Sequence, residues 1–410
     1  MDIVYLFQDP YPWDIRVEKI VTSLSDAGHN LHVVARNRGT EQIYELLDNR
    51  FDVYRLPPGF GHRSSQLLNF PAFFSPIWIG RLMQTVRRTQ AGLIIVRDLP
   101  LAATALFVSR LTGVPVIMDM AENYPAMIES TWRFRGARPL DYLIRNPRLL
   151  KRLERFVVPR LTGVMVVSEA SRRRVQSLKS TMPPVWVVGN TPSIERSAKH
   201  IEHPAAIAVR AHSGVKLLYV GFLEHMRGLE IVIRALPTLL AHGVEPLLTI
   251  VGDGEHRAEL ERLAASLGVA SSVHFVGWID QRFLPGIIAA ADICLIPHYV
   301  TEHTDTTLPN KIFDYMAQAK PVVVSHAAAL KDIVENYHCG ATYTDTSPSE
   351  LAGELLMLTD PERRKKLGEA GLKAVRQTFN WDVDRLALLE AVDHVGRRGI
   401  SRPNSTKKMS

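Results

Sequence analysis

The sequence has few cysteines, no long apolar run and no basic leader at its start. Its two cysteines, Cys294 and Cys339, lack a CxxC partner, which argues against a cysteine metal cluster or a disulfide framework and favours a reducing, cytoplasmic setting. No stretch reaches about 18 uninterrupted apolar residues, so we expect no transmembrane helix. The opening MDIVYLFQDPYPW carries an acid at its second position and does not resemble a signal peptide.

Two motifs that look like ligand sites are incomplete. VGDGEH (251–256) follows an apolar run but is not GxGxxG, and on its own it is a tight turn at least as often as a ligand loop. WDVD (381–384) resembles a metal-binding Asp-x-Asp motif, but residues two apart on a helix do not face together. We therefore expect no metal site and no cofactor.

What the chain does have is length and positive charge. Its 410 residues, 46% hydrophobic and 22% charged, are enough for two domains of about 200 residues each. The net charge of +7 suits nucleic acid, anionic lipid or phosphorylated ligands. No basic helix is interleaved with stacking aromatics as in a nucleic-acid module, so we expect no nucleic-acid partner.

Short apolar, β-branched runs alternate with segments of helical spacing along the chain. Such alternation predicts an α/β protein with two doubly wound parallel sheets, and we expect the two domains to face each other across a cleft. The expected strands are 2–7, 31–35, 92–96, 114–119, 163–168, 215–221, 247–254, 273–277, 293–297 and 321–325. The expected parts are an acceptor-binding domain (1–193), a linker (194–214), a donor domain (215–380), a helix that packs back toward the first domain (381–396) and a disordered tail (397–410).

One helix in the second half carries polar groups that packing alone does not require. In LPNKIFDYMAQAKPVVVS (308–325), Asn310, Lys311 and Asp314 fall near the start of an otherwise apolar helix. Thr307 is the expected N-cap, and the free N–H groups of the first turn favour an anion such as a diphosphate. Asp314 suits the two hydroxyls of a ribose, but it could equally stabilise the helix start and pair with Lys311.

These residues carry a resemblance to a known family. The second half resembles the donor domain of family 4 glycosyltransferases, retaining enzymes of the GT-B fold, through LLYVGFLEHMRGLEIVIRAL, LTIVGDGEHRAELERLAASLG, VHFVGWID, TTLPNKIFDYMAQAKPVVVS and LGEAGLKAVRQTFNWD. The match spans about 170 residues, and its PNK-FDY form is similar to one branch of the family. The first half resembles the acceptor domain through DIRVEKIVTSLSDAGHNLHVV, IIVRDLPLAATALFVSRLTGVPVIMDMAENYP and VMVVSEASRRRV.

The resemblance assigns roles in the donor half. Asp314 stands where the family holds the donor ribose, whereas Thr306 occupies the position of a glutamate that contacts the donor sugar. Arg227 and Lys311 are the candidates for binding the diphosphate, with Phe222 in the place of a family arginine. The donor-binding candidates are Asp314, Asn310, Thr306, Thr307, Leu308, Gly221, Gly252, Gly277 and Trp278.

The acceptor half offers charged residues after three expected strands. Asp119 and Glu122 follow one strand, with Ala121 where relatives often have a histidine, and Glu122 is the best carboxylate for the cleft, although a capping role fits it nearly as well. With Arg227 and Lys311 they complete the catalytic candidates. The acceptor-side candidates are Asp14, Arg16, Arg97 and Asp98.

The function that the resemblance implies is transfer of a sugar from a nucleotide-diphosphate sugar to an acceptor hydroxyl with retention, without a metal, in bacterial cell-surface polysaccharide or glycolipid synthesis. Two alternatives stay open. One is a nucleotide-sugar 2-epimerase, and the other is a non-catalytic partner subunit of an active transferase. The sequence does not specify the sugar, the base among UDP, GDP and ADP, or the acceptor.

Local charge adds an expectation about membranes. Between Arg133 and Lys179 thirteen Lys and Arg residues face only three acids. Within this region PRLLKRLERFVVPRL (147–161) alternates cations with apolar residues at helical spacing, as an interfacial helix would. An apolar wedge is expected upstream, from Phe70, Phe73, Phe74 and Trp78. We therefore expect a lipid-linked or glycan acceptor at the anionic inner face of the plasma membrane, while core helices with solvated arginines are the alternative.

Overall fold

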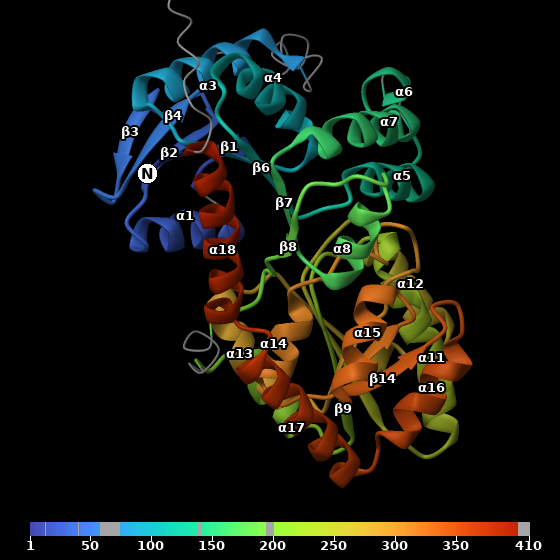
Figure 1. The fold of residues 1–410 in the computed structure, drawn as a ribbon. Coiled ribbons are helices and arrows are strands. Elements are labelled where there is room, and N and C mark those ends of the chain that lie inside the picture. Colours follow the sequence, from blue (N-terminus) through green and yellow to red (C-terminus); the bar gives the residue numbers. More distant parts are fainter. Residues whose placement is uncertain are drawn as a thin grey trace, which may run out of the picture. The chain divides into compact units, whose positions relative to one another are not determined.

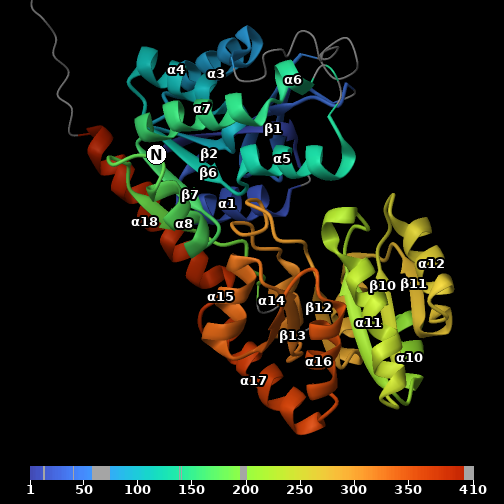
Figure 2. The ribbon, with the colours of Figure 1, turned by 90° about the vertical axis from the view of Figure 1, so that its right-hand side faces the viewer.

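The fold was analysed in a computed structural model, which describes residues 1–400 apart from 13, 40, 58–73, 138, 140 and 194–200. Two compact units make up the chain. Unit 1 contains Met1–Thr131, Gly136–Val188 and the residues from Asp384 onward, and unit 2 contains Trp132–Arg135 and Gly189–Val383. Both are α/β units (Figures 1 and 2).

Unit 1 is built on an eight-stranded sheet with the order β3-β4-β2-β1-β5-β6-β7-β8. Every neighbouring pair is parallel except β3 and β4. The strands are β1 (Asp2–Pro10), β2 (Asn30–Arg36), β3 (Tyr44–Leu47), β4 (Phe51–Arg55), β5 (Leu93–Arg97), β6 (Val116–Met120), β7 (Gly163–Val166) and β8 (Val185–Val187). The helices are α1 (Ile15–Asp26), α3 (Pro76–Thr89), α4 (Ala102–Thr112), α5 (Tyr124–Arg135), α6 (Asp141–Ile144), α7 (Pro147–Val157), α8 (Glu169–Gln176) and α18 (Trp381–Ile400).

Unit 2 is built on a six-stranded, fully parallel sheet with the order β11-β10-β9-β12-β13-β14. The strands are β9 (Val215–Val220), β10 (Pro246–Val251), β11 (Val273–Gly277), β12 (Ile293–Ile296), β13 (Val322–Ser325) and β14 (Gly340–Tyr343). The helices are α10 (Pro204–Ala211), α11 (Leu229–Ala241), α12 (Arg257–Ser266), α13 (Leu284–Ala290), α14 (Lys311–Ala317), α15 (Ala328–Tyr337), α16 (Pro348–Met357) and α17 (Pro361–Gln377).

Alternation along the strands of unit 2 divides its core into two layers. Leu217 and Tyr219 pack against α11, α12 and α16, whereas Leu218 between them packs against α10, α13, α14 and α17. Successive side chains of a strand point to opposite faces, so a continuously apolar strand must be covered on both sides. The prediction of doubly wound parallel sheets is thereby confirmed.

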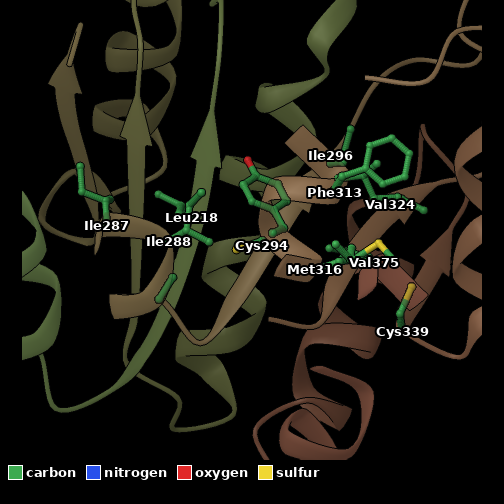
Figure 3. Packing of buried hydrophobic residues seen from close by; sticks show 14 of the residues in the cluster. Leu218, Ile287, Ile288, Cys294, Ile296, Phe313, Met316, Val324, Cys339 and Val375 are labelled. Atoms are coloured by element: carbon green, nitrogen blue, oxygen red, sulfur yellow. The ribbon is translucent and has the colours of Figure 1, made fainter. Parts of the chain in front are cut away.

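The second of these layers positions α14. Phe313 lies beside Ile296 and Val324, and Met316 lies near Val375 and Cys339 (Figure 3). A Cβ at Gly371 of α17 would come within 3.2 Å of Met316, so the small residue lets the two helices approach closely. This packing fixes the side of α14 that carries no polar group and leaves Lys311 and Asp314 for other contacts.

The last helix, α18, returns to unit 1. Its Val395 lies 3.5 Å from the position that a Cβ on Gly163 of β7 would occupy, and the His394 ring meets Trp186 of β8 edge-on with centroids 5.4 Å apart. In the part of the chain that the structure describes, no helix is both long and apolar enough to cross a bilayer.

Candidate functional site

Three glycines mark the carboxyl ends of three adjacent strands in unit 2, β9, β10 and the edge strand β11. Gly221, Gly252 and Gly277 follow or end β9, β10 and β11, and each has a positive φ. A Cβ on Gly252 would lie 2.0 Å from the carbonyl oxygen of Gly221, and one on Gly221 would lie 2.7 Å from Lys311 Nζ. Only glycine allows the loops to come so close to each other and to Lys311.

Two aromatic side chains stand exposed at the same strand ends. Phe222 and Trp278 are 57% and 63% exposed, and their rings meet edge-on with centroids 5.0 Å apart. Trp278 is one of the predicted donor-binding residues, whereas Phe222 occupies the position of a family arginine. Two paired aromatic rings exposed at strand ends form an apolar surface of the kind that suits a planar base.

Arg227 lies on a 3₁₀ turn, η4 (His225–Arg227), between β9 and α11. Its guanidinium pairs with Glu224 at 3.2 Å, while Nε is buried without a hydrogen-bond partner. The turn is held against the loop after β12 by a bond from the Tyr299 N–H to the Met226 carbonyl (3.1 Å). Arg227 thus has one acidic neighbour and retains an unused donor.

Lys311 is the first residue of α14. The prediction that Thr307 caps this helix is wrong, because Asn310 is the cap residue and its side chain makes no capping bond. Thr307, Leu308 and Pro309 lie outside the helix, and only Asn310 directly before it has turn geometry, so the cap lies three residues later than expected. The Lys311 ammonium lies 4.1 Å from the centroid of the buried Tyr219 ring, a cation–π contact.

The surroundings of Lys311 disfavour its charge. Burial, followed by the positive charge of Arg227, lowers the pKa of Lys311 well below its usual value. Among the described residues no carboxylate forms an ion pair with Lys311, although the negative charge of Glu224 acts on its pKa in the opposite direction. An anionic ligand would reverse both effects, since it supplies the missing opposite charge.

A histidine that the sequence analysis did not select lies in the same group. His298, two residues after β12, is 3% exposed and its Nε2 has no hydrogen-bond partner. Burial, then the nearby charges of Arg227 and Lys311, lowers the pKa of His298 well below its usual value. A neutral imidazole can still donate one N–H, so three donors converge here. The sequence signal was a histidine just beyond an apolar strand, which is equally typical of a core residue.

The remaining donor candidates differ in how they are used. The Thr306 hydroxyl is buried and donates to the carbonyls of Glu302 and His303, both at 3.1 Å. Thr307, Leu308 and Asp314 are half-buried, and Asn310 is exposed. Asp314 lies in the first turn of α14, three residues after Lys311.

In unit 1 the predicted residues form a buried charge network. Arg16 Nη2 and Nε reach Asp119 Oδ1 at 2.6 and 3.0 Å, Arg97 Nη1 reaches Oδ2 at 3.0 Å, and the Tyr5 hydroxyl donates to Oδ2 at 2.7 Å. Burial would raise the pKa of Asp119, but the two guanidiniums outweigh it and lower that pKa to about 2. Arg16 and Asp119 are almost inaccessible to solvent.

Asp98 connects this network to the loop after β6. Its Oδ1 accepts the N–H groups of Ala121 (2.8 Å) and Glu122 (3.1 Å), and its Oδ2 accepts Arg97 Nε at 3.1 Å. Burial raises the pKa of Asp98 to about 6, although Arg97 acts in the opposite direction. The backbone of Asp98 has φ 55° and ψ 178°, a region that non-glycine residues rarely adopt. Strain of this kind is typical of functional loops.

Asp14 and Glu122 complete the acceptor-side set. The Asp14 carboxylate caps α1 by accepting the N–H groups of Arg16 and Val17, both at 2.9 Å, and its other oxygen lies 3.7 Å from Arg97 Nη2. Glu122 is half-buried. Five of the six predicted residues of unit 1 therefore belong to one network, and the sixth, Glu122, joins it through its backbone.

The two aspartates of the Asp-x-Asp motif, at the start of α18, differ in burial. Asp384 is buried, whereas Asp382 is exposed. Their carboxylates thus face different surroundings, as expected for residues two apart on a helix.

Two family models match the chain and together cover both units. "Glycosyl transferase 4-like domain" matches residues 14–191, and "Glycosyl transferases group 1" matches residues 214–360.

Curated relatives are transferases or synthases in name. The alpha-D-kanosaminyltransferase of Streptomyces kanamyceticus is 24% identical over 76% of this chain and 80% of its own length. The glycogen synthase of Mycobacterium tuberculosis is 28% identical over 46% of this chain, which spans 44% of that enzyme. An uncharacterized glycosyltransferase of Methanocaldococcus jannaschii is 31% identical over 40% of this chain and 41% of its own length.

Solved structures share the fold at low sequence identity. Sucrose-phosphate synthase from Thermosynechococcus elongatus superposes with a TM-score of 0.78 at 16% identity over 97% of this chain and 99% of that one. An Anabaena protein crystallised with UDP superposes with a TM-score of 0.71 at 17% identity over 96% of this chain and all of that one. The two units have the GT-B fold, and the chain belongs to the family 4 glycosyltransferases.

Proposed function

We propose that this enzyme transfers a sugar from a nucleotide-diphosphate sugar to an acceptor hydroxyl with retention of anomeric configuration and without a metal in the transfer step. The observation that carries the proposal is the convergence of Lys311, Arg227 and His298 in unit 2. Glu224 is the acid that pairs with Arg227, and Lys311 has no ion-pair partner among the described residues. Such a group is complementary to a diphosphate.

The same residues supply the chemistry. As an acceptor hydroxyl attacks the anomeric carbon, the carbon–oxygen bond to the diphosphate breaks and negative charge builds up on the leaving oxygen. Cations already held in place by packing stabilise this charge without reorganising, which is where preorganised electrostatics contribute most. Arg227 and Lys311 would do what a metal ion does in other transferases.

Retention is proposed as attack from the face that the diphosphate leaves, as family membership implies. The departing phosphate would then take the proton of the acceptor hydroxyl. Glu122 and the strained Asp98 loop are proposed to position the acceptor, because the buried Arg16–Asp119–Arg97 network holds that loop in place.

The donor can be identified by ligand-induced stabilisation. UDP-, GDP- and ADP-sugars would be compared by thermal shift, since a ligand that binds only the folded state raises the melting temperature. The Anabaena structure with UDP makes UDP-sugars the first to test. The best donor should then be consumed only when an acceptor is added. Consumption without an acceptor would indicate an epimerase, and binding without turnover a partner subunit.

Asp314 provides a direct test of the ribose contact. Asp314→Asn should weaken donor binding by about 1.5–3 kcal/mol, the scale of a hydrogen bond to a charged group. Calorimetric titration with the best nucleotide measures the loss. Glu335→Gln is the matched control, because Glu335 is an exposed acid of α15 that pairs with Lys331 across one helical turn. If the Asp314→Asn enzyme binds the nucleotide with unchanged affinity, then Asp314 does not contact the ribose and only stabilises the start of the helix.

We further propose that the enzyme acts on a lipid-linked acceptor for cell-surface polysaccharide or glycolipid, as a peripheral protein on the inner face of the plasma membrane. The support comes from α7. Its single acidic residue, Glu154, is buried and paired with Arg174, while Arg148, Arg152 and Arg155 are exposed. Beside them Leu149 and Phe156 are 48% and 51% exposed. An outer face of cations and apolar groups suits an anionic bilayer surface.

The expected upstream wedge receives little support. Trp78 is 1% exposed and belongs to the core of unit 1, so it was assigned wrongly. Phe74 is exposed but meets Phe107 edge-on at 5.1 Å. Phe70 and Phe73 lie outside the described residues. The membrane proposal therefore rests on α7 alone.

Vesicle flotation tests the membrane proposal. The protein should float with vesicles that contain phosphatidylglycerol at low salt and leave them at about 0.5 M salt, where the Debye length is only a few ångström. Each cation near the surface contributes about 1 kcal/mol, so Arg148→Gln with Arg152→Gln should abolish flotation at intermediate salt. Leu111→Ser, an exposed apolar residue of α4, is the control. A protein that floats with neither neutral nor anionic vesicles at low salt would contradict the membrane proposal.

A further inference from the structure

A cluster of two histidines and a glutamate lies in unit 2, outside the residues used above. His225 begins the η4 turn, His256 precedes α12, and Glu259 lies in the first turn of α12. One ligand atom from each side chain lies within 4.8 Å of the other two. Glu259 Oε2 is the shared point, at 2.9 Å from His256 Nδ1 and 3.4 Å from His225 Nε2.

The inner histidine is held in place by a second carboxylate. His256 is 5% exposed, and its Nε2 faces Glu230 Oε2 at 3.5 Å, too long for an ordinary hydrogen bond. Glu230 is itself fixed, because its other oxygen accepts the Tyr299 hydroxyl at 2.8 Å. A histidine whose far nitrogen points at an anchored carboxylate has the orientation that metal-binding histidines show.

We propose that His225, His256 and Glu259 bind a zinc ion. Imidazole and carboxylate ligands at about 2.0–2.2 Å in a tetrahedral arrangement suit Zn²⁺, with water in the fourth position. Ligand atoms so placed lie roughly 3.3 Å apart, and the two contacts of Glu259 Oε2 bracket that value. The third separation can close by rotation, since His225 and Glu259 are partly exposed.

A proton offers the competing account of the cluster. Burial lowers the pKa of His256, but Glu230 and Glu259 outweigh burial and raise it, so a charged imidazole could bridge the two carboxylates. That account leaves His225 without a role, although its ring centroid lies 3.8 Å from that of His256. Two imidazoles beside one carboxylate oxygen are explained together by a shared cation.

Zinc would add a side-chain link between two segments that are already joined by a backbone bond from the His256 N–H to the Leu223 carbonyl (3.1 Å). The η4 turn and the start of α12 would be tied together, and Arg227 is two residues from His225 on that turn. The occupancy of this zinc site is measurable without any assay of sugar transfer.

Zinc binding to the untagged full-length chain tests the proposal. After treatment with a chelator and desalting, the protein should take up one equivalent of Zn²⁺ in competition with a chromophoric chelator, and its melting temperature should rise. Binding should weaken on acidification, because the histidines must be neutral to bind. Mg²⁺ should not compete.

Variants separate a built site from incidental binding. His225→Ala and Glu259→Gln should each lose stoichiometric binding while keeping the melting temperature of the zinc-free protein. Glu230→Gln, which still accepts the Tyr299 hydroxyl, should weaken affinity about 10–100-fold. His274→Ala, an exposed histidine on β11, is the control and should bind normally. Absence of stoichiometric uptake, or equal affinity in His225→Ala, would overturn the zinc site in favour of the proton.

Discussion

Asp119→Asn should lower the free energy of unfolding of unit 1 by about 3–5 kcal/mol, the cost of leaving buried charges without their partner. Two guanidiniums, Arg16 and Arg97, and the Tyr5 hydroxyl all converge on this carboxylate. An amide of the same shape keeps the volume but removes the negative charge. Urea denaturation at neutral pH, followed by circular dichroism, measures the loss.

The matched control is an aspartate–arginine pair on the surface of the same unit. Asp26 pairs with Arg50, and both side chains are more than a third exposed. Asp26→Asn should cost less than about 1 kcal/mol, because solvent screens exposed pairs. Comparable losses in the two variants would mean that the buried network contributes no more than a surface contact.

Acid should have the same effect as the Asp119 substitution. The folded-state pKa of Asp119 lies near 2, below the ordinary value for a carboxyl group. Its contribution to stability is therefore complete above that ordinary value and is lost as the pH falls toward 2. The difference between the wild type and Asp119→Asn should accordingly narrow below about pH 4.

Lys311→Met should reduce turnover by roughly 10²-fold, the effect of removing one preorganised donor to a developing negative charge. Methionine fills a similar apolar volume beside Tyr219 and introduces no new charge, so the fold should persist. Arg227→Ala should act similarly. Steady-state kinetics with the donor identified by thermal shift gives kcat for each variant.

Lys331→Met controls for the loss of a lysine in unit 2. Lys331 lies on α15 and, within the described part of the chain, forms an ion pair only with Glu335, so its loss should leave kcat within about twofold. A folded Lys311→Met enzyme with near-normal kcat would show that the leaving charge is stabilised elsewhere.

Ten strands could be predicted from the sequence because each is a short, largely apolar run that contains β-branched residues. Four were missed. The three residues of β8 are only half-buried, β3 alternates exposed and half-buried residues at the sheet edge, and β14 reads GATY. The fourth, β4, pairs with β3 and contains Asp52 and Arg55. These two charged residues interrupt the run of apolar residues by which a strand is recognised. Such strands are defined by their neighbours and not by their own composition.

The part of the candidate site that lies at the carboxyl ends of the strands could be predicted from the sequence. Lys311 could be chosen because helix starts and loops meet beyond the carboxyl ends of parallel strands, whereas Arg227 was implied by the resemblance to the family. Both share that edge with His298. Arg16 and Asp119 could not be recognised as a buried pair, since sequence does not show which charges are enclosed together. The same limit hid His298, because a buried histidine with an unused nitrogen looks like any core histidine.

The low pKa of Lys311 has a thermodynamic consequence. If part of the population holds Lys311 as a neutral amine, then diphosphate binding must be accompanied by proton uptake from the buffer. The binding enthalpy measured by calorimetry should therefore vary with the ionisation enthalpy of the buffer. Affinity should also fall as the pH rises through the interval between the free and bound pKa values, so that the cellular pH itself becomes a determinant of how much donor the enzyme holds.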